Sequence, residues 1–566
     1  MALRHYRSGR PDPVVTVEPL VRRTFLKQGL AAGATAAAAP LLTACNGAGE
    51  RAATVPGSVP PFALEEATVA DLQARMASGE LSATRITELY LERIAMVDRA
   101  GPTINSVLVT NPDAISLAAR ADSERAAGKV RGPLHGIPVL LKDNIDTADQ
   151  MRTTAGSLAL AESTAARDAG LVARLREGGA VILGKVNLSE WANIRSSRST
   201  SGWSAVGGLT KNPYVLDRNA CGSSAGTGAS IAANLACVGI GTETDGSIVC
   251  PANANGLVGI KPTVGLISRA GIVPISHTQD TAGPMCRTVR DAAALLSVVA
   301  GADPRDPTTA SSAGHLLADY TSACDAGALK GARIGVVRQL FNAGPQVDAV
   351  MAEALEALRS AGAILVDPVD IPSLAQLGDA EYTVLLHELK ADMAAYLATC
   401  GPNVPHRSLG DLIRFNEANR EAEMRWFGQE TFEMAERTQG LDAPAYRAAL
   451  AKCLRLTRAE GVDRALATYK VDALVAPTGG PAWVTDLVNG DHFGGGSSQL
   501  SAVSGYPAIT VPAGQVSGLP VGLTLMGPAW SEARLIGYAH AFEQVRKARR
   551  SPAFLPTVVP SSVRGA

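Results

Sequence analysis

The sequence predicts an α/β protein, and three observations lead to this prediction. Residues 168–180 and 347–363 have helical periodicity, and each segment is followed by a short apolar run typical of a strand, VILGK and ILVDP. The chain has 566 residues, of which 46% are hydrophobic and 19% charged, so it can form a large core. Residues 62–555 contain no sustained repeat and no long hydrophilic linker. We therefore expect one large domain.

The N-terminus has the features of an export signal. Arg22 and Arg23 resemble the start of a twin-arginine signal, and 17 residues, mostly Ala and Gly, separate Lys27 from Cys45. This stretch is short and weakly apolar for a membrane span. Leu42 to Cys45 resembles a lipobox, which would place a lipid on Cys45, whereas cleavage after Ala48 would give a soluble product. We predict a protein of the periplasm or cell envelope that the twin-arginine machinery exports.

Composition divides the chain into four parts. Residues 1–44 are predicted to be the signal peptide, residues 45–61 a flexible linker rich in Gly, Ala and Pro, residues 62–555 the catalytic domain and residues 556–566 a tail. The domain should open with two packed helices within residues 68–98, for which Thr68 and Asp71 are start signals.

Charge and composition exclude several classes of partner. There are 52 Lys and Arg against 53 Asp and Glu, so no overall field favours nucleic acid. Eight cysteines lack C-x-x-C spacing and eight histidines lack H-E-x-x-H spacing, so we expect neither a metal nor another cofactor. Disulfides cannot be inferred from this scatter, and Cys221 and Cys250 are interpreted as small buried apolar side chains.

Three segments contain the candidate chemistry, and each leaves alternatives open. CGSSAGTGAS (221–230) fits a nucleophile elbow on Ser224, with Asp486 and His540 as partners, or a small-residue loop that enters a helix. In GPLHGIPVLLKDNID (132–146), Lys142 is either a surface lysine paired with an aspartate or a buried base. In the third segment (241–263), Ser247 lies in a glycine-bounded turn that suits an oxyanion.

In this order, with SGYPAITVPAG (504–514), these segments resemble the amidase signature family of serine hydrolases, from about residue 65 to about residue 545. The resemblance implies one compact domain with a mixed, twisted sheet covered by helices on both faces. It also implies a triad of Lys142, Ser223 and Ser247, with Ser247 as the nucleophile and a cis peptide bond before Ser223. The backbone N–H groups implied to bind the oxyanion are those of Thr244, Asp245, Gly246 and Ser247.

The chemistry of this triad requires a neutral lysine. A free lysine titrates near 10.4, so action near pH 7 to 8 needs a pKa lower by about 3 units, and burial after the apolar PVLL run would supply this shift. Asp245 stands where many relatives have glycine. Since a carboxylate would repel the oxyanion, we expect Asp245 to point away or to contact a substrate amine.

The variant TETDGSIVCPA and residues 268–285 resemble the peptide amidase branch, which implies that a peptide amide or another small amide is hydrolysed with release of ammonia. Three alternatives stay open: an acyl-amide or aryl-amide hydrolase, a glutamyl-tRNA amidotransferase A-type chain, and an exported lipoprotein that binds amides without catalysis. Oligomeric state cannot be read from the sequence.

Overall fold

The structure, a computed structural model, describes residues 59–559. The predicted signal peptide, Cys45, most of the predicted linker and residues 560–566 lie outside the described residues, so the interpretations that concern them stay predictions. The described residues belong to one compact unit. None of their helices is both long enough and apolar enough to cross a membrane.

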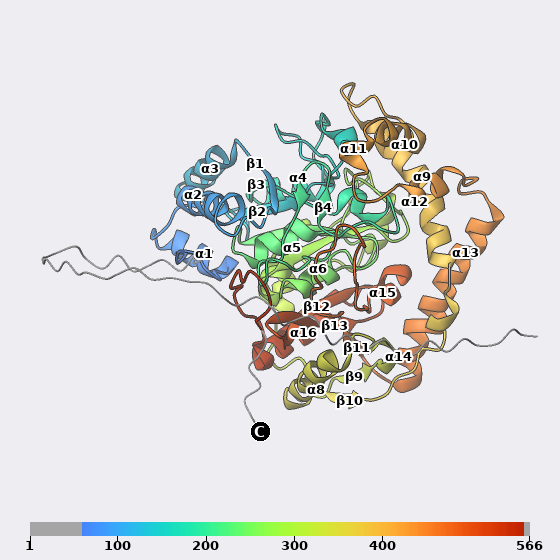
Figure 1. Cartoon of the computed structure of the whole chain (residues 1–566). Helices are drawn as coiled ribbons and strands as arrows, with labels where there is room; N and C mark the ends of the chain where they lie inside the picture. Colours follow the sequence, from blue (N-terminus) through green and yellow to red (C-terminus); the bar gives the residue numbers. More distant parts are fainter. Residues whose placement is uncertain (1–58, 560–566) are drawn as a thin grey trace, which may run out of the picture. The chain divides into compact units, whose positions relative to one another are not determined.

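One sheet of eleven strands forms the centre of the fold (Figure 1). In spatial order its strands are β1 (Val107–Thr110), β3 (Val181–Val186), β2 (Pro138–Lys142), β6 (Val238–Glu243), β8 (Thr281–Cys286), β7 (Val258–Lys261), β12 (Ala508–Val516), β13 (Leu519–Met526), β11 (Ala473–Pro477), β9 (Arg333–Val336) and β10 (Ile364–Val366). Strands β4 (Trp203–Ser204) and β5 (Gly208–Leu209) form a separate small pair.

The sheet is mixed, as the resemblance implied. Strand β2 pairs in parallel with both β3 and β6, and β9 pairs in parallel with β10 and β11, whereas the strands between these two groups are antiparallel. Strands β2, β3 and β6 are buried along their whole length. Such continuous apolar strands are expected where a sheet is covered on both faces.

Sixteen α-helices surround the sheet in the part of the chain that the structure describes. They are α1 (Val69–Ala77), α2 (Ala83–Arg93), α3 (Ala114–Ala126), α4 (Gly170–Glu177), α5 (Ala225–Ala232), α6 (Val249–Ala254), α7 (Val289–Val299), α8 (Pro345–Ser360), α9 (Ala380–Thr399), α10 (Leu409–Ala418), α11 (Arg420–Glu423), α12 (Glu430–Glu436), α13 (Pro444–Leu454), α14 (Asp463–Tyr469), α15 (Gln499–Ser504) and α16 (Glu532–Arg546).

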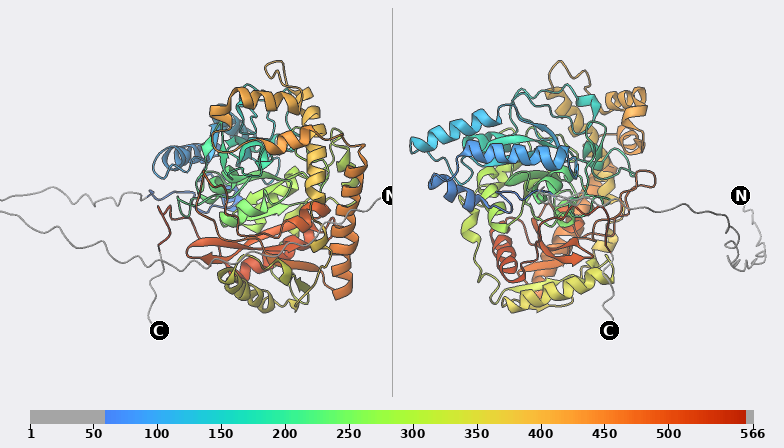
Figure 2. Two further views of the ribbon diagram at one scale, coloured as in Figure 1. Left: turned by 45° about the vertical axis from the view of Figure 1, so that its right-hand side comes forward. Right: turned by 60° about the vertical axis from the view of Figure 1, so that its left-hand side comes forward.

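The helices form groups that pack on different parts of the sheet. Helices α8 and α16 pack on β12, and α7 packs on β8. Helix α5 packs on β6, and α6 packs on β7. Helices α9, α10, α12 and α13 pack on one another, and Figure 2 shows them as a yellow-to-orange layer beside the sheet. Thr68 begins α1 with a reciprocal capping pair to Asp71, so the predicted start signal is confirmed.

Candidate active site

The candidate site lies where two neighbouring parallel strands end. Lys142 is the last residue of β2, and β6 ends beside it at Glu243, because Leu141 pairs with Ile240. Ser247 lies in the turn between β6 and α6, and Ser223 lies just before α5. The peptide bond from Gly222 to Ser223 is cis, as expected. Segments far apart in the sequence thus meet where the inner strands β2 and β6 end.

Lys142 is a buried base candidate and not a surface lysine. Its side chain is fully buried, and its Nζ lies 2.7 Å from Ser223 Oγ, 2.8 Å from Thr242 Oγ1 and 3.3 Å from the Thr242 carbonyl oxygen. Burial lowers the pKa of Lys142 to about 7, although Asp280 and Glu243 oppose the shift. A neutral amine here has a lone pair available for the Ser223 proton.

The two serines occupy different depths. Ser247 lines a cavity of about 300 Å³, whereas Ser223 is fully buried against Lys142. The Ser224 N–H donates to the Ser247 carbonyl oxygen at 3.3 Å, which joins the two segments. No hydrogen bond between the hydroxyls of Ser223 and Ser247 is present within residues 59–559. Ser247 is therefore the serine that faces the cavity, and Ser223 is the serine in contact with Lys142.

The turn before Ser247 is braced by a side chain. Oε2 of Glu243 accepts hydrogen bonds from the N–H groups of Ile248 at 2.8 Å and Val249 at 3.0 Å. These bonds join the two ends of the turn formed by residues 244–247. Gly246 has a φ of +80°, which favours glycine. In the described part of the chain, the N–H groups of Asp245, Gly246 and Ser247 make no hydrogen bond. A braced turn with free N–H donors suits an oxyanion.

Asp280 connects this turn to the cavity wall and was missed by sequence reasoning. Its carboxylate accepts the Thr244 hydroxyl at 2.6 Å and the N–H groups of Ile275 and Ser276 at 2.8 and 2.9 Å. Burial raises its pKa to about 6. An adjoining cavity, also about 300 Å³, is lined by Asp280 and shares Ala192, Thr244 and Ile275 with the first cavity. No spacing pattern marks Asp280 in the sequence.

Asp245 lines the cavity of Ser247. Its side chain is exposed to the solvent of the cleft, although protein atoms surround the cleft. Burial first, and then the neighbouring Glu381, raise its pKa well above the ordinary value for aspartate. Glu381 itself accepts Gln279 Nε2 at 3.0 Å and Gln499 Nε2 at 2.8 Å. A protonated Asp245 would have no charge of its own with which to repel an oxyanion.

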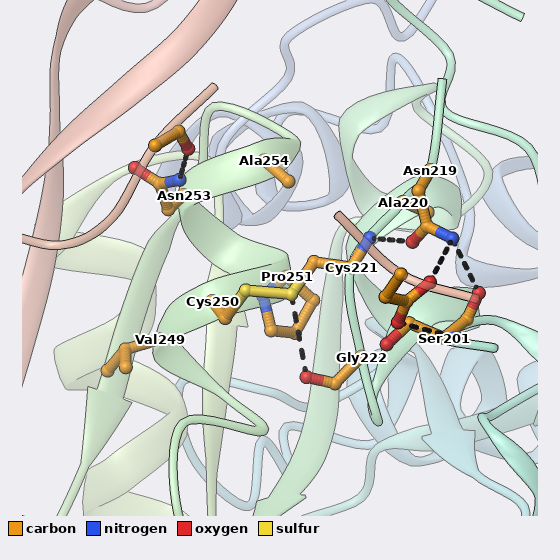
Figure 3. The surroundings of a disulfide bond; sticks show 12 residues. Ser201, Asn219, Ala220, Cys221, Gly222, Val249, Cys250, Pro251, Asn253 and Ala254 are labelled. Atoms are coloured by element: carbon orange, nitrogen blue, oxygen red, sulfur yellow. Dashed lines mark hydrogen bonds between the residues drawn. A yellow bond between two sulfur atoms is a disulfide. The ribbon is translucent and has the colours of Figure 1, made fainter. Parts of the chain in front are cut away.

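The interpretation of Cys221 and Cys250 as separate apolar side chains was wrong. They form a disulfide bond with a Cα–Cα distance of 6.1 Å (Figure 3), and both line the Ser247 cavity. Asn219 orients the Cys221 segment, because its Oδ1 accepts the Cys221 N–H at 2.7 Å while its Nδ2 donates to the Ser201 carbonyl oxygen at 2.8 Å. Since the two cysteines have a sequence separation of 29, only the fold brings them together.

The nucleophile elbow on Ser224 is excluded by geometry. Ser224 Oγ donates to the Thr242 carbonyl oxygen at 3.1 Å and accepts the Thr242 N–H at 3.2 Å, so its hydroxyl is used in packing α5 against β6. His540 lies beside Glu543 on α16, and Asp486 bonds Asn489. Neither residue supplies Ser224 with a base.

One cluster in the described residues has the composition of a metal site, namely His277, Glu388 and Asp392. Hydrogen bonds account for it without a metal ion. His277 Nδ1 lies 2.9 Å from Asp392 Oδ2, while Glu388 accepts the hydroxyls of Tyr446 at 2.7 Å and Thr278 at 3.0 Å.

The mixed sheet brings a buried lysine to a serine, and a braced turn holds a second serine nearby. This arrangement is typical of an amide hydrolase. A family model described as Amidase matches residues 85–536, and the chain belongs to the amidase family.

Individual relatives agree with this membership. The peptide amidase of Stenotrophomonas maltophilia is 53% identical to the chain and superimposes with a TM-score of 0.84, covering 87% of this chain and 100% of that one. A probable amidase of Arabidopsis thaliana is 42% identical over 503 residues, 87% of this chain and 93% of the relative. The A-type chain of the glutamyl-tRNA(Gln) amidotransferase of Halorhodospira halophila is 36% identical over 491 residues, 85% and 98% of the two chains.

Proposed function

We propose that this amidase removes the terminal amide from short peptides or related small amides and releases ammonia. The observation that carries the mechanism is the 2.7 Å contact between Ser223 Oγ and Lys142 Nζ, whose pKa is lowered to about 7. The substrate class is supported by the 53% identity to a peptide amidase. The substrate is a small molecule, and the balanced charge of the chain gives no support to a nucleic-acid partner.

The first step forms an acyl-enzyme. Ser247 Oγ attacks the carbonyl carbon of the amide and gives its proton to Ser223, which passes its own proton to neutral Lys142. The negative charge that develops on the carbonyl oxygen is stabilised by backbone N–H groups of residues 244–247. Loss of one such donor typically costs about 10² to 10³ in rate.

The relay then runs in reverse. Lys142, now an ammonium, returns the proton through Ser223 to the amide nitrogen, the C–N bond breaks, and ammonia leaves. A water molecule attacks the resulting ester of Ser247 while the same groups accept its proton. The sum is amide plus water giving acid plus ammonia, and no redox step is involved.

We also propose that the protein acts outside the cytoplasm, in the periplasm or cell envelope, after export by the twin-arginine machinery. Arg22 and Arg23 support this route, and a disulfide beside the candidate serines is typical of an oxidising compartment. A lipid on Cys45 would anchor the protein. Fractionation of cells expressing the full chain and its Cys45→Ala variant tests both points, because the anchored form should leave the membrane fraction on substitution.

The central experiment measures ammonia release from N-blocked dipeptide amides by the chain that begins at Cys45, with Ser247→Ala as the control. Release by the unsubstituted protein alone supports the proposal. Cleavage of acyl anilides or fatty amides instead would keep the triad and change the substrate. If the folded protein hydrolysed none of these amides, the assignment of this triad would be overturned.

The similarity to A-type amidotransferase chains favours a second candidate, in which the chain supplies ammonia to a partner enzyme. Glutamine hydrolysis that requires added partner proteins would support that candidate. Hydrolysis of peptide amides by the isolated chain would count against it.

A further inference from the structure

The cavity that Ser247 faces is lined by charges of one sign. Asp245 and Asp491 contribute carboxyl groups to its wall. Its lining, which falls wholly within residues 59–559, contains no lysine, arginine or histidine. The rest of the wall consists of small, hydroxyl, amide and apolar side chains with the aromatic rings of Trp483 and Phe493.

Asp245 forms part of a carboxyl pair. Glu381, on α9, lies against Asp245 and is itself buried. The amide groups of Gln279 and Gln499 donate to the two oxygens of Glu381, an arrangement that suits a charged carboxylate. Because the charge on one member opposes ionisation of the other, the pair holds a negative charge beside Ser247 even where Asp245 keeps its proton.

Asp491 adds a second fixed carboxylate. Its oxygens accept the Ser201 N–H at 2.9 Å and Trp483 Nε1 at 3.2 Å, with Asn219 Nδ2 at 3.4 Å. These donors are dipoles without a net charge. They hold the carboxylate in place in the cavity wall but do not cancel its charge.

The two arginines that line the adjoining cavity are already paired. Arg269 and Arg305 line the adjoining cavity, where Arg269 bonds Asp306 and Arg305 bonds Asp303. Lys142 is buried behind Ser223 and is the base that must be neutral to act. Among residues 59–559, no cation in the cavity lining offsets the carboxyl groups that face Ser247.

We propose that Asp245, Glu381 and Asp491 make this cavity charge-selective, so that it accepts amides whose neighbouring groups are neutral or cationic and rejects carboxylates. This inference rests on the proposed amide hydrolysis and specifies the substrate charge that the cavity selects. A substrate with an acidic side chain next to the scissile amide must bring a further negative charge into a cavity whose ionisable lining residues are all acidic.

The same selectivity acts on the product. Hydrolysis converts a neutral amide into a carboxylate at the position nearest to Asp245 and Ser247. The newly formed charge is repelled by the cavity wall, so the acid leaves readily and inhibits weakly. The cavity therefore distinguishes a peptide amide from the corresponding peptide acid, although the two differ only in one terminal group.

The test uses N-acetylated dipeptide amides that carry Arg, Gln or Glu at the residue bearing the amide, assayed at pH 7.5 and low salt. We expect kcat/KM to fall in the order Arg, Gln, Glu, with about a hundredfold between Arg and Glu, and the difference should shrink as salt is added. In the Asp245→Asn/Glu381→Gln/Asp491→Asn triple variant the ratio should fall below about threefold. A ratio within one variant does not depend on the fraction of folded protein.

A matched control removes two exposed carboxylates outside the cavity, Glu353→Gln on α8 and Asp442→Asn before α13. This variant should keep the ratio of the unsubstituted protein. Equal kcat/KM for the three amides would overturn the inference while leaving amide hydrolysis standing.

Binding to the Ser247→Ala variant decides the point even without turnover. Calorimetry should show that each peptide amide binds at least about tenfold more tightly than its acid, and that the difference is lost when Asp245→Asn, Glu381→Gln and Asp491→Asn are added. Equal affinity for amide and acid would overturn charge selectivity whatever reaction the protein performs.

Discussion

Nζ of Lys142 lies 2.7 Å from Oγ of Ser223, and both groups are fully buried. In the proposed mechanism this contact combines a proton acceptor with a relay hydroxyl at a place that solvent does not reach. The neutral form of the lysine is favoured because burial lowers its pKa to about 7. The protonation of one side chain should therefore control activity over the physiological pH range.

The first prediction concerns pH. Since only neutral Lys142 can accept the Ser223 proton, kcat/KM should rise about tenfold per unit below pH 7 and level off above it. Initial rates of ammonia release between about pH 5.5 and 10.5 measure this. A profile that is flat over the whole range, or that rises only above pH 9, would contradict the assignment of Lys142 as the base.

The second prediction concerns Asp280, whose carboxylate opposes the lowering of the Lys142 pKa. The Asp280→Asn variant should move the acid limb of the kcat/KM profile to lower pH, by up to about one unit. Asp392→Asn removes another carboxylate of the same adjoining cavity and should leave the limb in place. Identical profiles for the Asp280 variant and the unsubstituted protein would show that this charge is not felt at Lys142.

The third prediction links Lys142 to stability. Its pKa is about 7 in the folded protein and 10.5 in the unfolded chain, so the unfolded chain binds more protons between these values. The free energy of unfolding should therefore gain about 1.4 kcal/mol per pH unit from this group as pH rises from 7 to 10.5. Lys142→Met abolishes that gain.

Urea unfolding of both proteins measures the effect. The stability of the Lys142→Met variant relative to the unsubstituted protein should fall by about 2 kcal/mol between pH 7.5 and 9. A difference that stays constant with pH would mean that Lys142 remains charged in the folded state.

The fourth prediction separates the adjacent serines. Ser247→Ala and Ser223→Ala should each lower kcat by at least about 10³, because the relay needs both hydroxyls. Ser224→Ala should lower kcat less than tenfold, since its hydroxyl bonds only Thr242. His540→Gln on α16 should keep the activity. A loss of several thousandfold on changing His540 would restore the elbow mechanism that the geometry excludes.

The fifth prediction concerns the disulfide between Cys221 and Cys250. Reduction should lower the free energy of unfolding by about 2 to 4 kcal/mol, because the bond closes a loop with a sequence separation of 29. Melting with and without a thiol reductant, followed by circular dichroism, measures this. The Cys221→Ala/Cys250→Ala double variant should melt at the lower temperature under both conditions.

Much of the fold could be predicted from the sequence, because its signals are local. The helical period after Thr68 and the apolar runs ending in Lys142 and Lys185 correspond to α1, α2, β2 and β3. The mixed order of the sheet could not be read from such patterns. The pairing of β6 with β2 on one side and β8 on the other depends on contacts between distant segments.

Only part of the candidate site could be predicted from the sequence. Lys142, Ser223 and Ser247 stand in glycine-rich or strand-ending segments that the sequence marks. Asp280 and Glu381 carry no such mark, since each is an ordinary acidic residue until the fold places it beside the serine turn. The disulfide was missed for the same reason, because cysteine spacing gives no pairing.

The bond between Cys221 and Cys250 also closes a covalent ring that contains both Ser223 and Ser247. A protease that cuts the backbone once between these serines cannot separate them, since sulfur still joins the two pieces. On a denaturing gel the nicked protein would run as one species without reductant and as two with it. The two hydroxyls thus stay within a single covalent molecule after an internal cut.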